Sequence, residues 1–231
     1  MKLIIHRGTH EVGGSCVELI SRSGDTRIVM DIGMPLVDKN GTPFKWRTYQ
    51  NKSIDELLQE GILPKLQKFY KPQVDALLIS HAHQDHYGFV QFCHPNIPIH
   101  ISEGTKELIE ISNIFIDTKA ETVGMKPFKM WEAFQINEFK ITPYLVDHSA
   151  FDAVAFLIED DDKKLFYTGD FRSHGRKGIL FERLVSNPIR DVDCLVIEGT
   201  MLGRPGGIYS SETDVENKIY EILRNKTTYA F

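Results

Sequence analysis

The chain has 231 residues, of which 42% are hydrophobic and 26% are charged. This composition is that of an ordinary folded domain, and it excludes a chain that is disordered throughout. The formal net charge of −5 gives no global electrostatic reason to expect nucleic-acid binding, although it leaves room for a local basic groove.

The cysteines and the apolar runs indicate in which cellular compartment the protein resides. Cys16, Cys93 and Cys194 are widely spaced and form no C-x-x-C pair. An odd number of cysteines without paired spacing argues against a disulfide framework and favours a reducing compartment. The N-terminal apolar run is too short for a signal peptide, and no stretch reaches the length of a transmembrane helix. We therefore expect a cytoplasmic protein without membrane contact.

The first part of the chain predicts short strands joined by turns. The predicted strands are residues 3–6, 16–20 and 27–30. A glycine-rich turn over residues 8–15 leads into a strand rather than a helix, so we favour a tight connection near a site over a phosphate-binding loop. Residues 53–58 are a predicted helix, because Ser53 and Glu56 have the spacing of a capping box.

The most informative stretch follows an apolar run over residues 74–79, which has the length of a buried strand. Four potential metal ligands come directly after it: His81, His83, Asp85 and His86. In a tight turn at a strand end, the first two can point to one side while the last two reach another, which suits two adjacent metal ions. Imidazole nitrogen and carboxylate oxygen are both good zinc ligands. A polar loop with clustered histidines is the alternative, and the buried strand before it makes that interpretation the weaker one.

Strands and helices alternate in the rest of the chain. The predicted strands are residues 97–101, a strand through residue 136, and residues 139–143, 153–158, 165–168 and 192–197. A helix over residues 103–115 is predicted, with Ser102 as its N-cap and an apolar stripe facing the core. A last helix follows Ser211, where Asp214 completes a capping box, and residues 227–231 have the pattern of a strand.

Polar residues mark three later strand ends. They lie in the sequences Val146-Asp147-His148-Ser149, Thr168-Gly169-Asp170 and Glu198-Gly199-Thr200. A buried aspartate at position 170 would be costly without a cation beside it, which is a physical reason to expect metal there. Four basic residues follow it, and we favour a solvated loop over a phosphate-contacting rim for them: Arg172, Arg176, Lys177 and Arg183.

Together these motifs resemble the metallo-β-lactamase superfamily. The H-x-H-x-D-H stretch, the lone His148 and the T-G-D unit are similar to its successive metal-binding motifs. The resemblance implies an αββα sandwich of mixed α/β class, incomplete at the C-terminus. It also implies one ion on His81, His83 and His148, and a second on Asp85, His86 and Asp170, with Asp170 bridging both. By the same resemblance, Asp31 supports the histidine loop through hydrogen bonds, while the adjacent Asp147 could orient an imidazole.

The E-G-T unit and the glycine-rich turn resemble the β-CASP branch, the nuclease division of this superfamily. This implies a phosphodiesterase or ribonuclease that acts through a zinc-bound hydroxide, with RNA or another phosphodiester as its partner. Asp85, Asp170 and Glu198 are then the expected catalytic residues, and Glu198 is expected to order a ligand histidine. Two Zn²⁺ ions per complete site are implied, with Mn²⁺ as the alternative. A homo-oligomer is compatible with the sequence.

One expected feature is missing, because no histidine occurs after His174. The superfamily usually adds a later histidine to the second metal ion. We therefore expect residues 1–200 to form a metallo-β-lactamase-like domain and residues 201–231 to begin a following segment or an inserted β-CASP-like domain. The second ion should bind more weakly, and this chain alone should be poorly active.

Two other functions use the same residues. A hydrolase of a small-molecule ester, thioester or lactone would employ the same nucleophile at a carbonyl carbon. A non-catalytic metal-binding module would keep the ligands without turnover. The E-G-T unit and the glycine-rich turn favour the nuclease over the small-molecule hydrolase, whereas the apparent truncation lends weight to the non-catalytic module.

Overall fold

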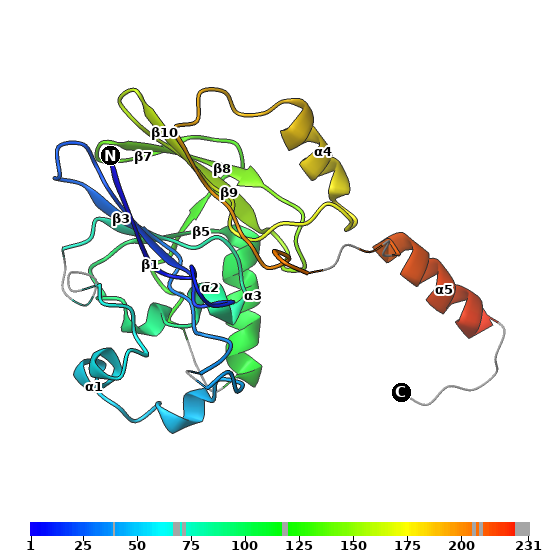
Figure 1. Ribbon diagram of the computed structural model, residues 1–231, viewed down its shortest axis with the longest axis horizontal. Helices are drawn as coiled ribbons and strands as arrows, with labels where there is room; N and C mark the ends of the chain where they lie inside the picture. Colours follow the sequence, from blue (N-terminus) through cyan, green and yellow to red (C-terminus); the bar gives the residue numbers. More distant parts are fainter. Residues whose placement is uncertain are drawn as a thin grey trace.

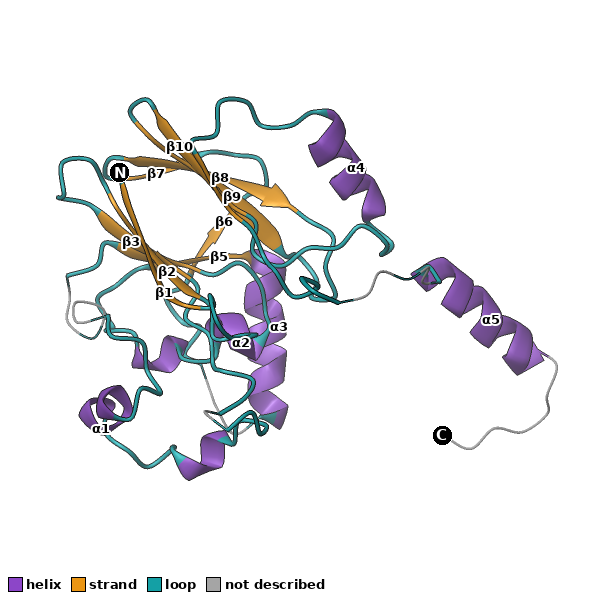
Figure 2. Ribbon diagram, viewed as in Figure 1, coloured by secondary structure: helices purple, strands orange, loops and turns teal. Residues whose placement is uncertain are grey.

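The computed structural model describes residues 1–38, 40–66, 70, 73–116, 120–204, 207 and 210–224. In this part of the chain two β-sheets pack face to face, with helices on their outer sides (Figures 1 and 2). The predicted α/β class and the αββα layering are confirmed.

The first sheet has six strands in the order β1-β2-β3-β4-β5-β6. The first three are antiparallel neighbours, whereas β3 to β6 run parallel. Parallel neighbours need crossover connections, and here these carry the helices of one outer layer. The strands are β1 (Lys2–Arg7), β2 (Cys16–Ile20), β3 (Arg27–Met30), β4 (Ala76–Leu78), β5 (Ile99–Ser102) and β6 (Lys126–Phe128).

The second sheet has five strands in the order β11-β10-β9-β8-β7. Neighbouring strands are antiparallel except β10 and β11, which run parallel because a helical crossover connects them. The strands are β7 (Phe134–Ile136), β8 (Phe139–Leu145), β9 (Val154–Asp160), β10 (Lys163–Tyr167) and β11 (Cys194–Val196).

Helices α1 (Ile54–Gln59) and α3 (Glu103–Phe115) begin where the sequence supplies N-caps. Ser53 and Glu56 form the predicted capping box of α1, and Ser102 accepts a hydrogen bond from Thr105 at the start of α3. The helices are α1 (Ile54–Gln59), α2 (Gln84–Tyr87), α3 (Glu103–Phe115), α4 (Gly178–Ser186) and α5 (Glu212–Arg224), with 3₁₀ turns at Trp46–Thr48 and Val90–Phe92.

The buried apolar side chains form successive layers. Between the sheets, Met30 of β3 packs with Phe139 and Phe156 of the second sheet. On the outer face of the first sheet, Ile79 and Phe89 belong to a cluster that includes the residues of α1 and α3. The second sheet is covered on its outside by a smaller cluster. Burial of these large side chains, at roughly 2 kcal/mol each, is the main force that holds the layers together.

Two predictions about helices were wrong. The loop predicted around Arg183 is helix α4, whose apolar residues cover the second sheet beside Phe171. The apolar stripe of α3 does not face the core along its whole length, since Ile111 is 55% exposed and Phe115 is 81% exposed. The first half of α3 packs on β5 and β6, while its second half extends past the sheet (Figure 1).

Helix α5 projects away from the sandwich (Figure 1). Its predicted N-terminal box is present, because Ser211 Oγ and Asp214 Oδ2 lie 2.6 Å apart. Its apolar side chains are not buried, since Val215 and Ile219 are about half exposed. The strand predicted over residues 227–231 lies outside the described residues, and the division of the chain at residue 200 stays a prediction.

The structure also bears on the cysteines and on membrane-spanning segments. Cys16, Cys93 and Cys194 are free thiols, and burial raises the pKa of the Cys93 thiol to about 12. Within the described ranges, no helix combines the length and apolar character that crossing a membrane requires.

Candidate metal centre

The segment from Ser80 to His86, called the histidine turn below, lies where carboxyl ends of strands from both sheets meet. It follows β4, and the main-chain N–H of Val154 in the second sheet donates to Ser80 O at 3.0 Å. Tyr167, at the end of β10, crosses from the second sheet to Asp31, at the end of β3, with an O–O distance of 2.6 Å. Residues far apart in the sequence are therefore fixed at one edge of the sandwich.

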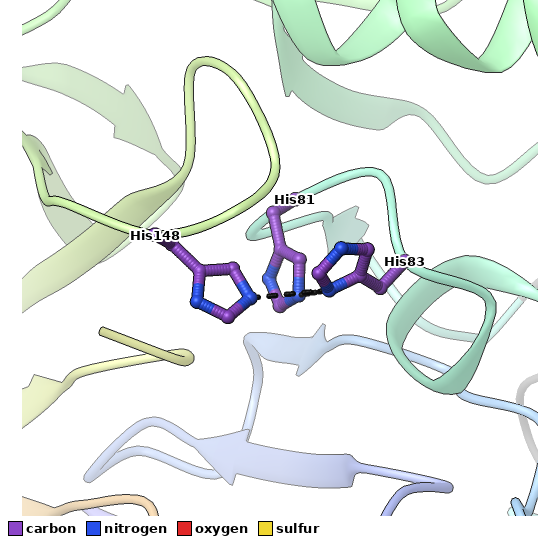
Figure 3. Close-up of side chains that lie close together, drawn as sticks. All are labelled: His81, His83 and His148. Atoms are coloured by element: carbon purple, nitrogen blue, oxygen red, sulfur yellow. Dashed lines mark hydrogen bonds between the residues drawn. The ribbon is translucent and has the colours of Figure 1, made fainter. Parts of the chain in front are cut away.

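Three imidazoles converge at this edge (Figure 3). His81 Nε2 and His148 Nε2 each lie 3.1 Å from His83 Nδ1. One nitrogen from each ring falls within a cluster whose members are all less than 4.8 Å apart. Two nitrogens on a tetrahedral zinc ion are about 3.3 Å apart, so the group has the spacing of a ligand set.

A second group of potential ligands shares one histidine with the first and consists of His81, His86 and Asp170. His86 Nε2 lies 3.3 Å from Asp170 Oδ1, and the other oxygen of Asp170 lies 3.9 Å from His148 Nε2. The carboxylate therefore faces both groups, as a bridging ligand would. Asp85 lies at the margin, with Oδ2 4.0 Å from His86 Nε2, and belongs to neither group.

The electrostatics suit cation binding. Burial lowers the pKa values of His81, His83 and His148, the last to about 4, so these rings are neutral and have free lone pairs at neutral pH. Burial also acts on His86, but Asp31 and Asp170 outweigh it and raise the pKa of that ring to about 10. The carboxylates thus favour positive charge at this position, which is what a divalent ion supplies.

Asp31 holds the histidine turn from below, as expected. It is fully buried, and its carboxylate accepts hydrogen bonds from Ser80 N at 2.8 Å and from Ser80 Oγ at 2.7 Å. The same carboxylate lies 2.8 Å from His86 Nδ1 and accepts from the Tyr167 hydroxyl. These contacts fix the ring of His86 with Nε2 toward the centre.

A family comparison now bears on this arrangement. A family model described as "Beta-lactamase superfamily domain" matches residues 53–213, which include the histidine turn, His148 and Asp170. The chain belongs to the β-lactamase superfamily. Among solved structures, a protein of unknown function from Enterococcus faecalis has a TM-score of 0.79 at 21% identity, covering 96% of this chain and 57% of that one. A metallo-β-lactamase HARLDQ motif mutant from Cronobacter sakazakii has a TM-score of 0.50 at 12% identity, covering 92% and 77%.

Several of the curated relatives carry ribonuclease names. A Methanocaldococcus jannaschii protein named RNase J-like is 28% identical over 95% of this chain and 47% of its own length. Ribonuclease J of Mycoplasma genitalium is 27% identical over 74% of this chain and 31% of its own. A transcription termination factor of Methanothermobacter thermautotrophicus, FttA, is 25% identical over 94% and 35%. The chain thus spans about half the length of the first of these relatives and about a third of the others.

A cleft of about 590 Å³ opens beside the candidate metal centre. Its walls include Asp85, His86, Asp170 and Glu198, and the glycine-rich connection forms its rim at Gly8 and Gly13. This connection brings backbone to the site, as predicted. His10 lines a neighbouring cavity instead, and Glu11 is paired with Arg7 at 3.1 Å.

Glu198 and Asp147, which were expected to orient histidines, bind other groups in the structure. The Glu198 carboxylate accepts from the main-chain N–H of Phe171 at 2.9 Å, and its own N–H donates to Thr168 Oγ1 at 3.2 Å. Glu198 therefore braces the turn that carries Asp170, because β11 ends beside that turn. Asp147 binds Arg172 at 3.3 Å, and its carboxylate makes no hydrogen bond to an imidazole among the described residues.

Sequence reasoning missed two supporting residues of the centre. Ser80 Oγ lies 3.0 Å from His81 Nδ1 as well as donating to Asp31, and Tyr167 supplies the hydroxyl described above. Their signal was position alone, because each ends a buried run directly before a candidate metal-binding motif.

Proposed function

We propose that this protein is a metal-dependent hydrolase that cleaves phosphodiester bonds of RNA, a nuclease of the β-CASP type. The observation that carries the proposal is the convergence of four histidines and Asp170 at one edge of the sandwich, where His86 and Asp170 line an open cleft. The ribonuclease names of the relatives support RNA as the substrate class.

In this proposal one ion is held by His81, His83 and His148, and a second by His86 and Asp170 with Asp85 at its margin. Nitrogen and carboxylate donors at these spacings fit Zn²⁺ best, and Mn²⁺ is the alternative. When bound, such a pair of ions supplies an activated water at neutral pH and stabilises charge on the phosphoryl oxygens.

The protein's own groups do the positioning. Asp170 presents one oxygen to each histidine group and so fixes the separation between them. Glu198 holds the Asp170 turn through the Phe171 amide, and Asp31 holds His86 in one orientation. Asp85, on the cleft wall, is placed to hold a proton of the attacking water at a carboxylate oxygen.

We place the protein in the cytoplasm, in keeping with its free thiols, and take residues 1–200 as the metallo-β-lactamase unit. The described residues offer no further histidine at the centre for the second ion or for protonating the leaving group.

The test compares substrates under metal control. Protein purified without chelator is assayed on a short labelled RNA and on a generic thioester, before and after removal of metal. We expect RNA cleavage that is lost with the metal and regained when Zn²⁺ or Mn²⁺ is added back. Turnover of the thioester with RNA untouched would reject the nuclease, and RNA cleavage that persists without metal would reject the mechanism.

A further inference from the structure

Arg172 joins the two loops that carry His148 and Asp170. Its main-chain N–H donates to Asp147 O at 2.7 Å, and its Nε lies 3.3 Å from Asp147 Oδ1. Asp147 directly precedes His148, and Arg172 follows Asp170 by two positions. The residue thus ties one candidate ligand loop to the other through both main chain and side chain.

The pair it makes with Asp147 is enclosed. The Asp147 side chain is 1% exposed, and its Oδ2 has no hydrogen-bond partner among the described residues. The loop after Arg172 closes over this pair at Gly175, where a Cβ would lie 2.4 Å from both Asp147 Oδ2 and Arg172 Nε. A buried carboxylate in this position depends on the guanidinium for its compensation.

A second carboxylate holds the outer side of the same guanidinium. Arg172 Nη1 lies 2.7 Å from Glu212 Oε1 at the start of α5, and Arg176 pairs with Glu216 one turn later at 2.6 Å. Both arginines form ion pairs, but Arg172 is largely enclosed, unlike the solvated residue predicted, whereas Arg176 is exposed as predicted. The planar fork of Arg172 can serve two carboxylates at once, which a lysine cannot do with the same geometry.

We propose that Arg172 is a positioning residue that sets His148 at the correct distance from Asp170 for metal binding. The inference rests on the proposed function, because it takes these two side chains as ligands. Metal ligands must lie within about 0.2 Å of their ideal distances, so a small shift of either loop weakens binding. Loss of the guanidinium leaves Asp147 buried and uncompensated, and the loop must move to hydrate it.

The experiment measures metal affinity rather than turnover. Zn²⁺ affinity is determined by chelator competition, and the geometry by the visible absorption of the Co²⁺-loaded protein. Arg172→Met should weaken affinity about 10- to 100-fold and change the Co²⁺ spectrum, as loss of groups that orient ligands does. Arg172→Lys should recover part of the loss. The matched control is Arg176→Met, which removes a neighbouring ion pair to α5 and should leave affinity within about twofold.

The outcomes separate this inference from the proposed function. If wild-type protein binds metal and cleaves RNA while Arg172→Met has unchanged affinity and spectrum, Arg172 has no positioning role. If wild-type protein binds no metal, the proposed function itself fails. Should Arg172→Met unfold, the double variant Asp147→Asn/Arg172→Met removes the uncompensated charge. It should fold and still bind metal weakly, whereas wild-type affinity in it would overturn the proposal.

Discussion

His86 Nδ1 lies 2.8 Å from the carboxylate of Asp31, at the bottom of the candidate metal centre. This contact leaves Nε2 directed toward Asp170. Asp31, which follows β3, therefore determines which nitrogen of His86 faces the site. Asp31 has a φ of 56°, a left-handed conformation that asparagine tolerates better than most residues. Asparagine at this position therefore tests the charge without adding backbone strain.

Asp31→Asn should lower the free energy of unfolding by about 2 kcal/mol or more, because a buried acceptor of several hydrogen bonds loses its charge. Urea denaturation of the metal-free protein measures this loss. Tyr167→Phe is the matched control, since it removes one donor to the same carboxylate and should cost about 1 kcal/mol. Equal stability of Asp31→Asn and wild type would show that Asp31 does not support the turn.

His83→Ala should reduce RNA cleavage by roughly 10³-fold, because it removes a nitrogen from the centre of the first ligand group. The ring is half-buried, so the free energy of unfolding without metal should change by less than about 1 kcal/mol. The control is His94→Ala, a histidine outside both ligand groups that caps the amide of Asn96. Retained turnover in His83→Ala would mean that the centre is assigned wrongly.

Gly33→Ala should disrupt the histidine turn, because Gly33 packs against the main chain of that turn. An added Cβ would lie 1.6 Å from the carbonyl oxygen of Asp85, a main-chain atom that cannot move without the turn. We expect a loss of about 3 kcal/mol or more in stability together with reduced metal content, measured by denaturation and by elemental analysis. Gly199→Ala is the matched control, because its Cβ would meet the mobile end of the exposed Leu202 side chain. A stable, metal-replete Gly33→Ala would contradict the described packing of the turn.

The predicted ligand residues that the structure brings together share one property: they follow buried strands. His81, His148 and Asp170 follow apolar runs whose carboxyl ends meet, so periodicity together with the family resemblance was enough to bring them to one edge. The contacts of Glu198 and Arg172 were not predictable in this way. They depend on how neighbouring loops cross in space, and a single sequence does not encode that crossing in any local pattern.

The same distinction holds for the fold. Helix α3 was bounded correctly because Ser102 caps it, but its exposed second half could not be foreseen from an apolar stripe alone. Helix α4 was missed because Lys177, at its start, makes no side-chain cap. Where tertiary packing rather than a capping residue defines an element, the sequence carries little local signal.

His100 should make stability depend on pH. Its ring stacks on Phe134 with centroids 5.1 Å apart, and burial, aided by Lys126, lowers its pKa to about 4. The unfolded chain, with a pKa near 6.5, binds more protons between these values, so this contribution is complete above about pH 6.5 and is lost as the pH falls toward 4. Between pH 7 and pH 5, wild type should lose about 1 kcal/mol more than His100→Phe, allowing for screening of the partly exposed ring.

Urea denaturation with chelator at pH 7, 6 and 5 measures that difference. Other histidines, including His148 with its lowered pKa, contribute equally to both proteins and cancel. Parallel pH profiles of wild type and His100→Phe would show that His100 titrates normally in the folded protein.

The central claim is that His81, His83, His148, His86 and Asp170 surround a pair of divalent ions. Anomalous diffraction at the zinc absorption edge, from crystals grown with Zn²⁺, tests this most directly. Two anomalous peaks are expected about 3.5 to 4 Å apart, one against the three-histidine group and one between His86 and Asp170. Peaks confined to exposed histidines such as His10, with none between His148 and the histidine turn, would contradict it.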